Sequence, residues 1–330
     1  MNAKNTIGWI LGLAGCAAAG IAIGAANYYY EYCLTPKGSA PDRAWALPRR
    51  EIEAGRRWVN GHVRRQDVFI ISDDGLQLHG NYIKAAYPDA HRYAICVHGF
   101  YDDSTGTGIY AKRYYEEHGM TVLLPDLRGH GSSEGSYIGM GYRDSRDLVR
   151  WINFIVTQDP QAVIILHGVS LGAAAVCMAC AERLPSQVKA VISDSAFTNA
   201  SEMVTSIYNS SDRAFIPASF MVPCIRALCL LRARYALGKA NCVRALSHSQ
   251  VPVLFIHGEE DDFAPASMMP KLYEAAAGRK DFLWIRGASH KQAVIRNPER
   301  YWKKVEKFLG DISVWILNDN LRDTDPFAEM

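Results

Sequence analysis

The sequence lacks the features that mark nucleic-acid-binding, disulfide-rich and cofactor-dependent proteins. Its 330 residues include 36 Lys and Arg against 34 Asp and Glu, so no strong basic field is available to attract nucleic acid. Eight scattered cysteines are too few for a disulfide scaffold, and we interpret the C-x-x-C pair Cys177 and Cys180 as buried apolar residues. No H-E-x-x-H, EF-hand, P-loop or dinucleotide-binding pattern occurs, so the sequence implies no metal and no organic cofactor.

The composition is that of an ordinary globular protein. Apolar residues make up 49% and charged residues 21% of the chain, which excludes an intrinsically disordered protein or a collagen-like fibre. A chain of 330 residues is also long enough to form one large α/β core.

The first 30 residues contain a long uncharged run. No charged residue occurs between Lys4 and Glu31, and residues 7–26 are almost entirely apolar. About 20 helical residues span roughly 30 Å, the thickness of the hydrocarbon core of a bilayer. Aromatic residues suited to the headgroup region flank the run: Trp9, Tyr28, Tyr29 and Tyr30. We therefore predict a single-pass membrane anchor over residues 1–30.

Three properties of this anchor stay open. Leu13 to Cys16 resemble the lipobox of a bacterial lipoprotein, but the apolar run continues beyond Cys16, which favours an uncleaved anchor over acylation and cleavage. The basic residues that follow the run favour a cytoplasmic body, whereas the likeness to signal anchors of bacterial surface hydrolases favours an external one. Small residues that would allow self-association recur every four positions: Gly8, Gly12, Cys16, Gly20 and Gly24.

Residues 31–66 form a basic stretch. They contain eight Lys or Arg residues against four acidic ones, with Trp45 and Trp58 among them. We predict a juxtamembrane linker here, which either contacts anionic headgroups or is a solvated linker with an entry helix.

From residue 67 to the C-terminus the chain alternates short apolar runs with helical patterns. The predicted strands are 68–72, 76–83, 93–97, 121–124, 163–166, 190–192, 253–256 and 282–285. The predicted helices are 108–118, 143–157, 171–184, 266–277 and 298–309. We expect one opening hairpin and then a mostly parallel sheet with helices on both faces. Residues of about 199–249 are too long and too apolar for a loop, and we predict that they form an inserted helical cap.

The pentapeptide G-x-S-x-G at residues 168–172 is the first sign of chemistry. It follows the predicted strand 163–166 and opens a helix, the context in which such a serine is held exposed above a sheet. We therefore predict Ser170 as a nucleophile. The backbone amide of the next residue, Leu171, is the expected donor to the oxyanion that forms in acyl transfer.

A nucleophilic serine needs a histidine base and a carboxylate that orients it. His290 follows the predicted strand 282–285, at the sheet edge where Ser170 also lies, and is the predicted base. The acid lies within the contiguous run Glu259, Glu260, Asp261 and Asp262, among which spacing alone does not choose.

Residues of about 67–310 resemble the α/β-hydrolase superfamily, and most resemble its bacterial serine-hydrolase branch of feruloyl esterases, monoacylglycerol lipase-like enzymes and serine aminopeptidase-like proteins. Residues 126–133 are similar to the D-x-R-G-H-G-x-S segment of that branch, and residues 257–261 to its H-G-x-x-D loop. The resemblance implies Asp261 as the acid, with Asp262 and then Asp194 as the alternatives. It also implies the Phe100 amide as the second oxyanion donor, within the H-G-x segment. The one departure is Ala264, where a valine usually precedes the proline.

These residues together predict a membrane-held serine hydrolase that cleaves carboxylic esters through an acyl-enzyme. An apolar cap and a membrane anchor favour a small-molecule ester with a hydrophobic, lipid-like acyl chain. The other histidines near strand ends, His98, His130, His167 and His257, are interpreted as hydrogen-bonding scaffold residues. An acyltransferase or a peptidase that uses the same triad, and a non-catalytic binding protein, remain as alternatives.

Overall fold

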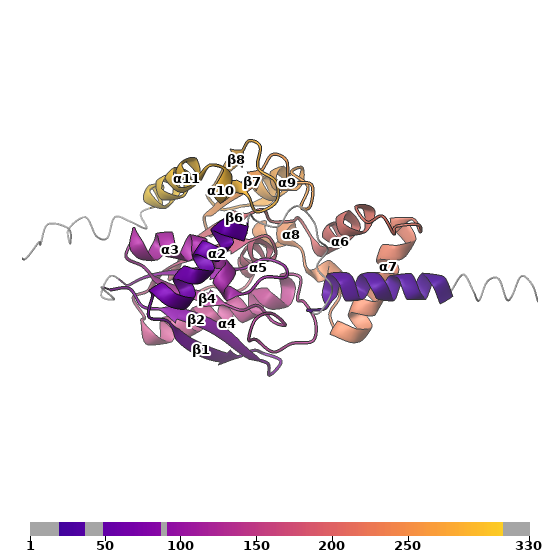
Figure 1. Ribbon diagram of the computed structural model, residues 1–330, viewed down its shortest axis with the longest axis horizontal. Helices are drawn as coiled ribbons and strands as arrows, with labels where there is room; N and C mark the ends of the chain where they lie inside the picture. The colour runs from indigo at the N-terminus through magenta and orange to yellow at the C-terminus, as the bar shows by residue number, and fades with distance from the viewer. Residues whose placement is uncertain (1–19, 37–48, 87–90, 313–330) are drawn as a thin grey trace, which may run out of the picture.

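The computed structural model describes residues 20–36, 49–86 and 91–312, and its centre is one eight-stranded sheet (Figure 1). The strand order is β1-β2-β4-β3-β5-β6-β7-β8. The strands are β1 Gln66–Ile71, β2 Gln77–Ile83, β3 Arg92–Val97, β4 Thr121–Pro125, β5 Val163–Val169, β6 Val188–Asp194, β7 Val253–Gly258 and β8 Lys280–Ile285. Strand β2 pairs antiparallel with both β1 and β4, and all other pairs are parallel. The predicted hairpin and mostly parallel sheet are therefore confirmed.

Helices cover both faces of the sheet. The helices outside the cap are α2 Arg49–Arg57, α3 Gly108–Glu116, α4 Tyr142–Gln158, α5 Leu171–Ala179, α9 Met268–Ala275, α10 Ala293–Arg296 and α11 Pro298–Asp311. Alternate strand residues pack in two apolar layers, one on each face of the sheet. Ile164 and Leu166 of β5 pack in the layer that contains α4 and α5, whereas Ile165 packs in the layer that contains α3 and α11. Every residue of β5 is buried, which explains its continuous apolar sequence.

Helix α5 is shorter than its sequence pattern predicts. It ends at Ala179, and the amides of Cys180, Ala181 and Glu182 instead bond to carbonyls three residues earlier. Pro185 follows shortly afterwards, and a proline disfavours helical backbone in the residue before it. The last turn of the predicted helix therefore tightens and stops.

The cap, residues 199–249, connects β6 to β7 and consists of short helices. They are α6 Ala200–Asn209, α7 Ala218–Leu228, the π-helical turn η4 Cys229–Ala233, the 3-10 turn η5 Leu237–Lys239 and α8 Cys242–Leu246. The Asn199 side chain caps α6 by accepting a hydrogen bond from the Glu202 amide at 2.9 Å. The two ends of the cap meet at a bridge between Asn199 and Asn241.

Residues 20–34 form a helix that packs against the cap, where Figure 1 shows it in indigo beside α7. The Tyr29 ring lies 4.5 Å from that of Tyr208, and its hydroxyl donates to Ser211 Oγ at 2.9 Å. Tyr29 and Tyr30 are buried, so the expectation that they flank an anchor at headgroup level is wrong, because the cap rather than lipid covers their rings.

The predicted anchor lies mostly outside the described residues, as do Trp9, the lipobox-like segment and the first three small residues of the stripe. Within residues 20–36, 49–86 and 91–312, no helix has both the length and the apolar character needed to cross a bilayer. At Gly20 and Gly24, no other atom lies within 4 Å of the position of a Cβ.

The second half of the predicted juxtamembrane linker is part of the folded body. Arg56 of α2 donates to Asp102 at 2.6 Å and to Asp103 at 2.7 Å, so it is not available to lipid headgroups. Trp58 is buried and donates to Glu116 Oε1 at 2.8 Å. Helix α2 is the entry helix that the sequence predicts, and these contacts hold it and the turn after it against the folded body.

Candidate active site

Ser170 lies on the tight turn between β5 and α5. Its backbone has φ 57° and ψ −114°, a left-handed conformation that a residue with a side chain adopts only under strain. The turn also requires Gly172, because a Cβ at that position would lie 2.2 Å from the Val97 carbonyl oxygen. The strand, the strained serine and the close approach to β3 form the turn that the G-x-S-x-G pattern predicts.

The structure brings Ser170, His290 and Asp261 together. Ser170 Oγ lies 2.7 Å from His290 Nε2, and His290 Nδ1 lies 2.7 Å from Asp261 Oδ2. The three residues follow β5, β8 and β7 at the same edge of the sheet. All three are buried, with Ser170 only 4% exposed. The geometry forms a continuous chain of hydrogen bonds from a carboxylate through an imidazole to a hydroxyl.

Burial and neighbouring groups set the charges of Asp261 and His290. Burial opposes the charge of Asp261, but His290 and His257 outweigh it and hold the pKa of that carboxyl well below its ordinary value. The other oxygen, Oδ1, accepts from the amides of Phe263 and Ala264 at 3.1 and 2.9 Å. Burial lowers the pKa of His290 despite the opposing effect of Asp261. At neutral pH the pair is therefore a carboxylate beside a neutral imidazole.

The other candidate acids lie elsewhere. Asp262 is exposed, as are Glu259 and Glu260. Asp194 is buried, and its carboxylate accepts from Ser195 Oγ at 2.9 Å and from the Tyr301 hydroxyl at 3.0 Å. Burial raises the pKa of Asp194 to about 6. Of the candidate acids, Asp261 is the one that contacts His290.

Two amides have the properties of oxyanion donors. In the described part of the chain, neither the Phe100 amide nor the Leu171 amide donates to another protein group. The loop that carries Phe100 lies against the nucleophile, since a Cβ on Gly99 would be 3.2 Å from the Cβ of Ser170. A buried pair of unsatisfied donors next to a serine is suited to the negative oxygen of a tetrahedral intermediate.

The histidines interpreted as scaffold residues make structural hydrogen bonds. His98 Nε2 accepts from the Leu127 amide at 3.0 Å, and His257 Nε2 lies 2.9 Å from the Ala264 carbonyl. His167 is bonded at both nitrogens to the hydroxyls of Tyr114 and Tyr301, each at 2.9 Å. These contacts join the loops around the site to the strands beneath them.

Sequence reasoning missed two residues beside the site. Lys291 is buried, its amide donates to Ser195 Oγ at 3.3 Å, and its Cδ lies 3.4 Å from the Cβ position of Gly99. Its place directly after the predicted base was the available signal. Tyr101 follows the expected oxyanion donor and donates from its hydroxyl to the Tyr32 carbonyl of the N-terminal helix. No sequence pattern joins residues so far apart.

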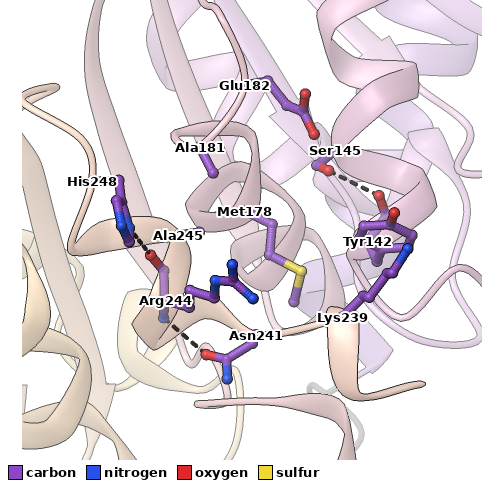
Figure 2. Close-up of a pocket in the computed structure, with 10 residues that line it drawn as sticks. All are labelled: Tyr142, Ser145, Met178, Ala181, Glu182, Lys239, Asn241, Arg244, Ala245 and His248. Atoms are coloured by element: carbon purple, nitrogen blue, oxygen red, sulfur yellow. Dashed lines mark hydrogen bonds between the residues drawn. The ribbon is translucent and has the colours of Figure 1, made fainter. Parts of the chain in front are cut away.

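A surface cleft of about 420 Å³ lies at a distance from this chemistry, between α4, α5 and the cap (Figure 2). It is lined by Tyr142, Ser145, Met178, Ala181, Glu182, Lys239, Asn241, Arg244, Ala245 and His248. None of the hydrogen-bonded residues Ser170, His290 and Asp261 lines this cleft. No cluster of three His, Cys, Asp or Glu residues within the described ranges is arranged to hold a metal ion.

The sheet order, the strained serine and the two loops that supply the histidine and the aspartate define the class of α/β hydrolases. The chain belongs to the alpha/beta hydrolase family, whose model matches residues 94–303.

Similar proteins include YqkD of Bacillus subtilis, 26% identical over 196 residues, or 59% of this chain and 64% of the Bacillus protein. This chain therefore spans less than two thirds of that relative's length. The solved structure of the Pyrococcus furiosus esterase Pf2001 covers 82% of this chain and 96% of its own, with a TM-score of 0.57 and 19% identity. The match to the Pyrococcus horikoshii acylaminoacyl peptidase covers 75% of this chain and 41% of the peptidase, with a TM-score of 0.55 and 19% identity. At these identities the two structures establish the shared fold alone.

Proposed function

We propose that the protein is a serine hydrolase that cleaves carboxylic esters through an acyl-enzyme intermediate. The observation that carries the proposal is the chain of two 2.7 Å contacts, from Asp261 through His290 to Ser170, at a strained turn. A serine hydroxyl is a weak nucleophile unless a neutral base takes its proton, and the lowered pKa of His290 supplies that base at neutral pH.

In the first half-reaction Ser170 Oγ bonds to the ester carbonyl carbon while its proton passes to His290 Nε2. The carbonyl electron pair moves onto oxygen, and the amides of Phe100 and Leu171 stabilise that oxyanion. Asp261 stabilises the imidazolium that forms. When the carbonyl re-forms, the bond to the leaving alcohol breaks, and the alcohol takes the proton from Nε2. The acyl group then remains on Ser170.

In the second half-reaction water replaces the alcohol. His290 takes a proton from water while the water oxygen attacks the acyl carbon, and the amides of Phe100 and Leu171 stabilise the second oxyanion. When the carbonyl re-forms, the bond to Ser170 Oγ breaks and Oγ takes the proton back from His290 Nε2. The products are a carboxylic acid and the free enzyme. An acceptor alcohol or amine in place of water would make the same intermediate a transferase.

We further propose a hydrophobic acyl group as the substrate's acid part. Phe100 of the oxyanion loop is buried, and the Phe263 ring lies 4.7 Å from the ring of His290. The cap contacts the loop after β7 that carries Asp261, since Ser206 Oγ of α6 donates to the Phe263 carbonyl at 3.3 Å. Apolar walls around a few polar groups favour a substrate with an extended hydrocarbon chain. An ester series of increasing acyl length tests this preference, and higher activity on acetyl esters or on aminoacyl amides contradicts it.

The test of the function uses the full-length chain in detergent with a fluorophosphonate probe. We expect one adduct, on Ser170, that disappears in Ser170→Ala and His290→Ala and persists in Ser186→Ala, which changes an exposed serine. Mass spectrometry locates the adduct, and thermal unfolding confirms that each variant is folded. A folded wild-type protein that takes up no probe, or takes it up at another residue, would overturn the proposal and favour a non-catalytic binding protein.

A further inference from the structure

The cap and the N-terminal helix share an unusual surface. Ten large apolar side chains are exposed among the described residues, and seven of them lie on these two elements. They are Ile21, Ile23, Tyr28, Phe215, Phe220, Leu230 and Leu231. The other three, Phe69, Ile71 and Phe282, lie on β1 and β8 at the two edges of the sheet. Apolar residues scattered singly over a surface need no explanation, whereas a concentration on neighbouring elements marks an interaction site.

The outer face of α7 is apolar where a surface helix is normally polar. Its exposed residues at helical spacing include Phe220, Cys224 and Ala227, and Leu231 continues the same stripe into η4. The inner face is also apolar, with Met221 and Ile225 buried against the rest of the cap. A helix that is apolar on both faces needs a second apolar partner.

We infer that this face of the cap, together with residues 20–28, docks on a lipid bilayer whose surface is anionic. One argument is continuity. The described part of the N-terminal helix begins at Gly20, inside the uncharged run that extends back to Lys4. Figure 1 shows this helix at one end of the molecule, next to α7 and with its N-terminal end directed away from the sheet. An apolar phase that covers the exposed Ile21 and Ile23 of this helix therefore also lies beside the exposed face of the cap.

Charge gives a second, independent argument. Residues 210–249 contain six Lys or Arg residues and one acidic residue, although the whole chain is nearly neutral. Arg226 and Arg234 are exposed in the same segment of the cap as Phe220, Leu230 and Leu231. Basic residues around an apolar face suit the acyl boundary and the anionic headgroups of a membrane surface.

The boundary between the apolar and charged zones is marked by paired residues. Glu31, the first charge after the run, accepts from Arg232 at 3.1 Å, and the Arg232 guanidinium lies 5.1 Å from the centre of the Tyr30 ring. Arg213 lies over the ring of Tyr28 in the same way, at 5.5 Å. These pairs hold the helix and the cap together as one surface that carries both arginines and exposed apolar side chains.

Cys224 provides a probe at the centre of this face. It is the exposed one among the described cysteines, the other six of which are buried, and a Cys16→Ser background removes the one cysteine outside the described residues. The full-length protein, labelled at Cys224 with an environment-sensitive fluorophore, is reconstituted into vesicles of phosphatidylcholine with about one third phosphatidylglycerol. We expect a blue-shifted emission that spin-labelled lipid quenches and aqueous iodide does not. Emission in detergent-free phosphatidylcholine alone should shift less.

Two sets of variants separate this docking from anchoring by the first 30 residues. Phe215→Ser, Phe220→Ser, Leu230→Ser and Leu231→Ser together should abolish the shift and the lipid quenching, although the protein stays with the vesicles. The matched control, Ile71→Ser with Phe282→Ser, removes exposed apolar residues from the sheet edges and should change neither signal. Arg226→Gln with Arg234→Gln should remove the difference between the two lipid compositions. Circular dichroism melting shows that each variant is folded, independently of any catalytic assay.

The proposal is wrong if the fluorophore in wild-type vesicles remains quenched by iodide and untouched by the lipid quencher. It is also wrong if the shift appears in detergent and depends on protein concentration together with a dimer mass in light scattering, because a second copy of the chain would then cover the face. Neither result depends on whether Ser170 reacts.

Discussion

Two histidine–aspartate pairs in this molecule have the same hydrogen-bond length but opposite roles. His290 lies 2.7 Å from Asp261 at the reacting edge of the sheet, and His79 of β2 lies 2.7 Å from Asp126 in the loop after β4. Both aspartates have pKa values below the ordinary range, that of Asp126 at about 2. Distance and partner alone therefore do not distinguish a catalytic base from a structural histidine.

The second ring nitrogen makes the difference. His290 Nε2 lies against the hydroxyl of Ser170, and burial lowers the pKa of the ring. His79 Nε2 lies 2.9 Å from a second carboxylate, Asp67, and the two acids raise its pKa. Burial lowers the pKa of His290 and so leaves a lone pair on Nε2 for the serine proton, whereas the two carboxylates beside His79 favour the protonated form of that ring.

The largest expected effect is the loss of the nucleophile. We expect Ser170→Ala and His290→Ala each to lower kcat on an activated ester by roughly 10⁶-fold, with little further loss in the double variant, because the two residues act as one unit. Steady-state kinetics on the full-length chain measure this. A double variant that loses the product of the two single effects would show that the residues act independently.

The role of the single carboxylate is tested next. Asp261→Asn keeps the shape of the acid but removes its charge, so we expect kcat to fall by roughly 10⁴-fold. The adjacent Asp262→Asn is the matched control, because that side chain is exposed, and it should stay within about twofold of wild type. Equal losses in the two variants would contradict the assignment of the acid.

The pH profile tests the state of His290. Because its pKa lies below 6.5, the neutral base is already present at pH 7, and activity falls only as the ring gains a proton in acid. We expect kcat/KM to lose about tenfold per pH unit below that pKa, with the midpoint of the acid limb under pH 6.5. A midpoint above pH 7 would mean that Asp261 raises the pKa of His290 by more than burial lowers it.

The fold was largely accessible from the sequence because buried parallel strands leave continuous apolar runs. The runs at 163–166 and 253–256 lie within β5 and β7, and the G-x-S-x-G pattern lies between a predicted strand and a predicted helix, as in the structure. The N-terminal region was less predictable. An apolar helix and its tyrosines suit a bilayer and a protein surface equally well, and only the position of the cap shows that Tyr29 and Tyr30 are buried by protein.

The site was predictable where function needs a local pattern and unpredictable where it depends on distant contacts. Ser170 and His290 follow strands in recognisable loops, and the H-G-x-x-D resemblance singled out Asp261 from four adjacent acids. The only sequence signal for Lys291 was its position directly after the predicted base, His290. His79 gave none at all, because Asp67 and Asp126 reach it through strand pairing and a loop rather than through spacing along the chain.

Apart from the control variants, the smallest expected change in activity comes from His79→Gln, which removes the ring that lies between Asp67 and Asp126. Asp126 keeps hydrogen bonds from the Ser104 and Ser132 amides at 2.7 and 2.9 Å, so we expect kcat/KM within about threefold of wild type and a loss of about 1–3 kcal/mol of unfolding free energy.

That loss has a defined pH dependence. The raised pKa of His79 contributes stability that is fully present below its unfolded value of about 6.5 and is lost as pH rises through the folded pKa. The lowered pKa of Asp126 contributes stability above about pH 4 and loses it as pH falls toward 2. Urea unfolding should therefore show the largest difference between wild type and His79→Gln near pH 5 and a smaller one at pH 9. A hundredfold fall in kcat/KM at unchanged stability would instead assign this second pair to the reaction and remove the distinction drawn from its two carboxylates.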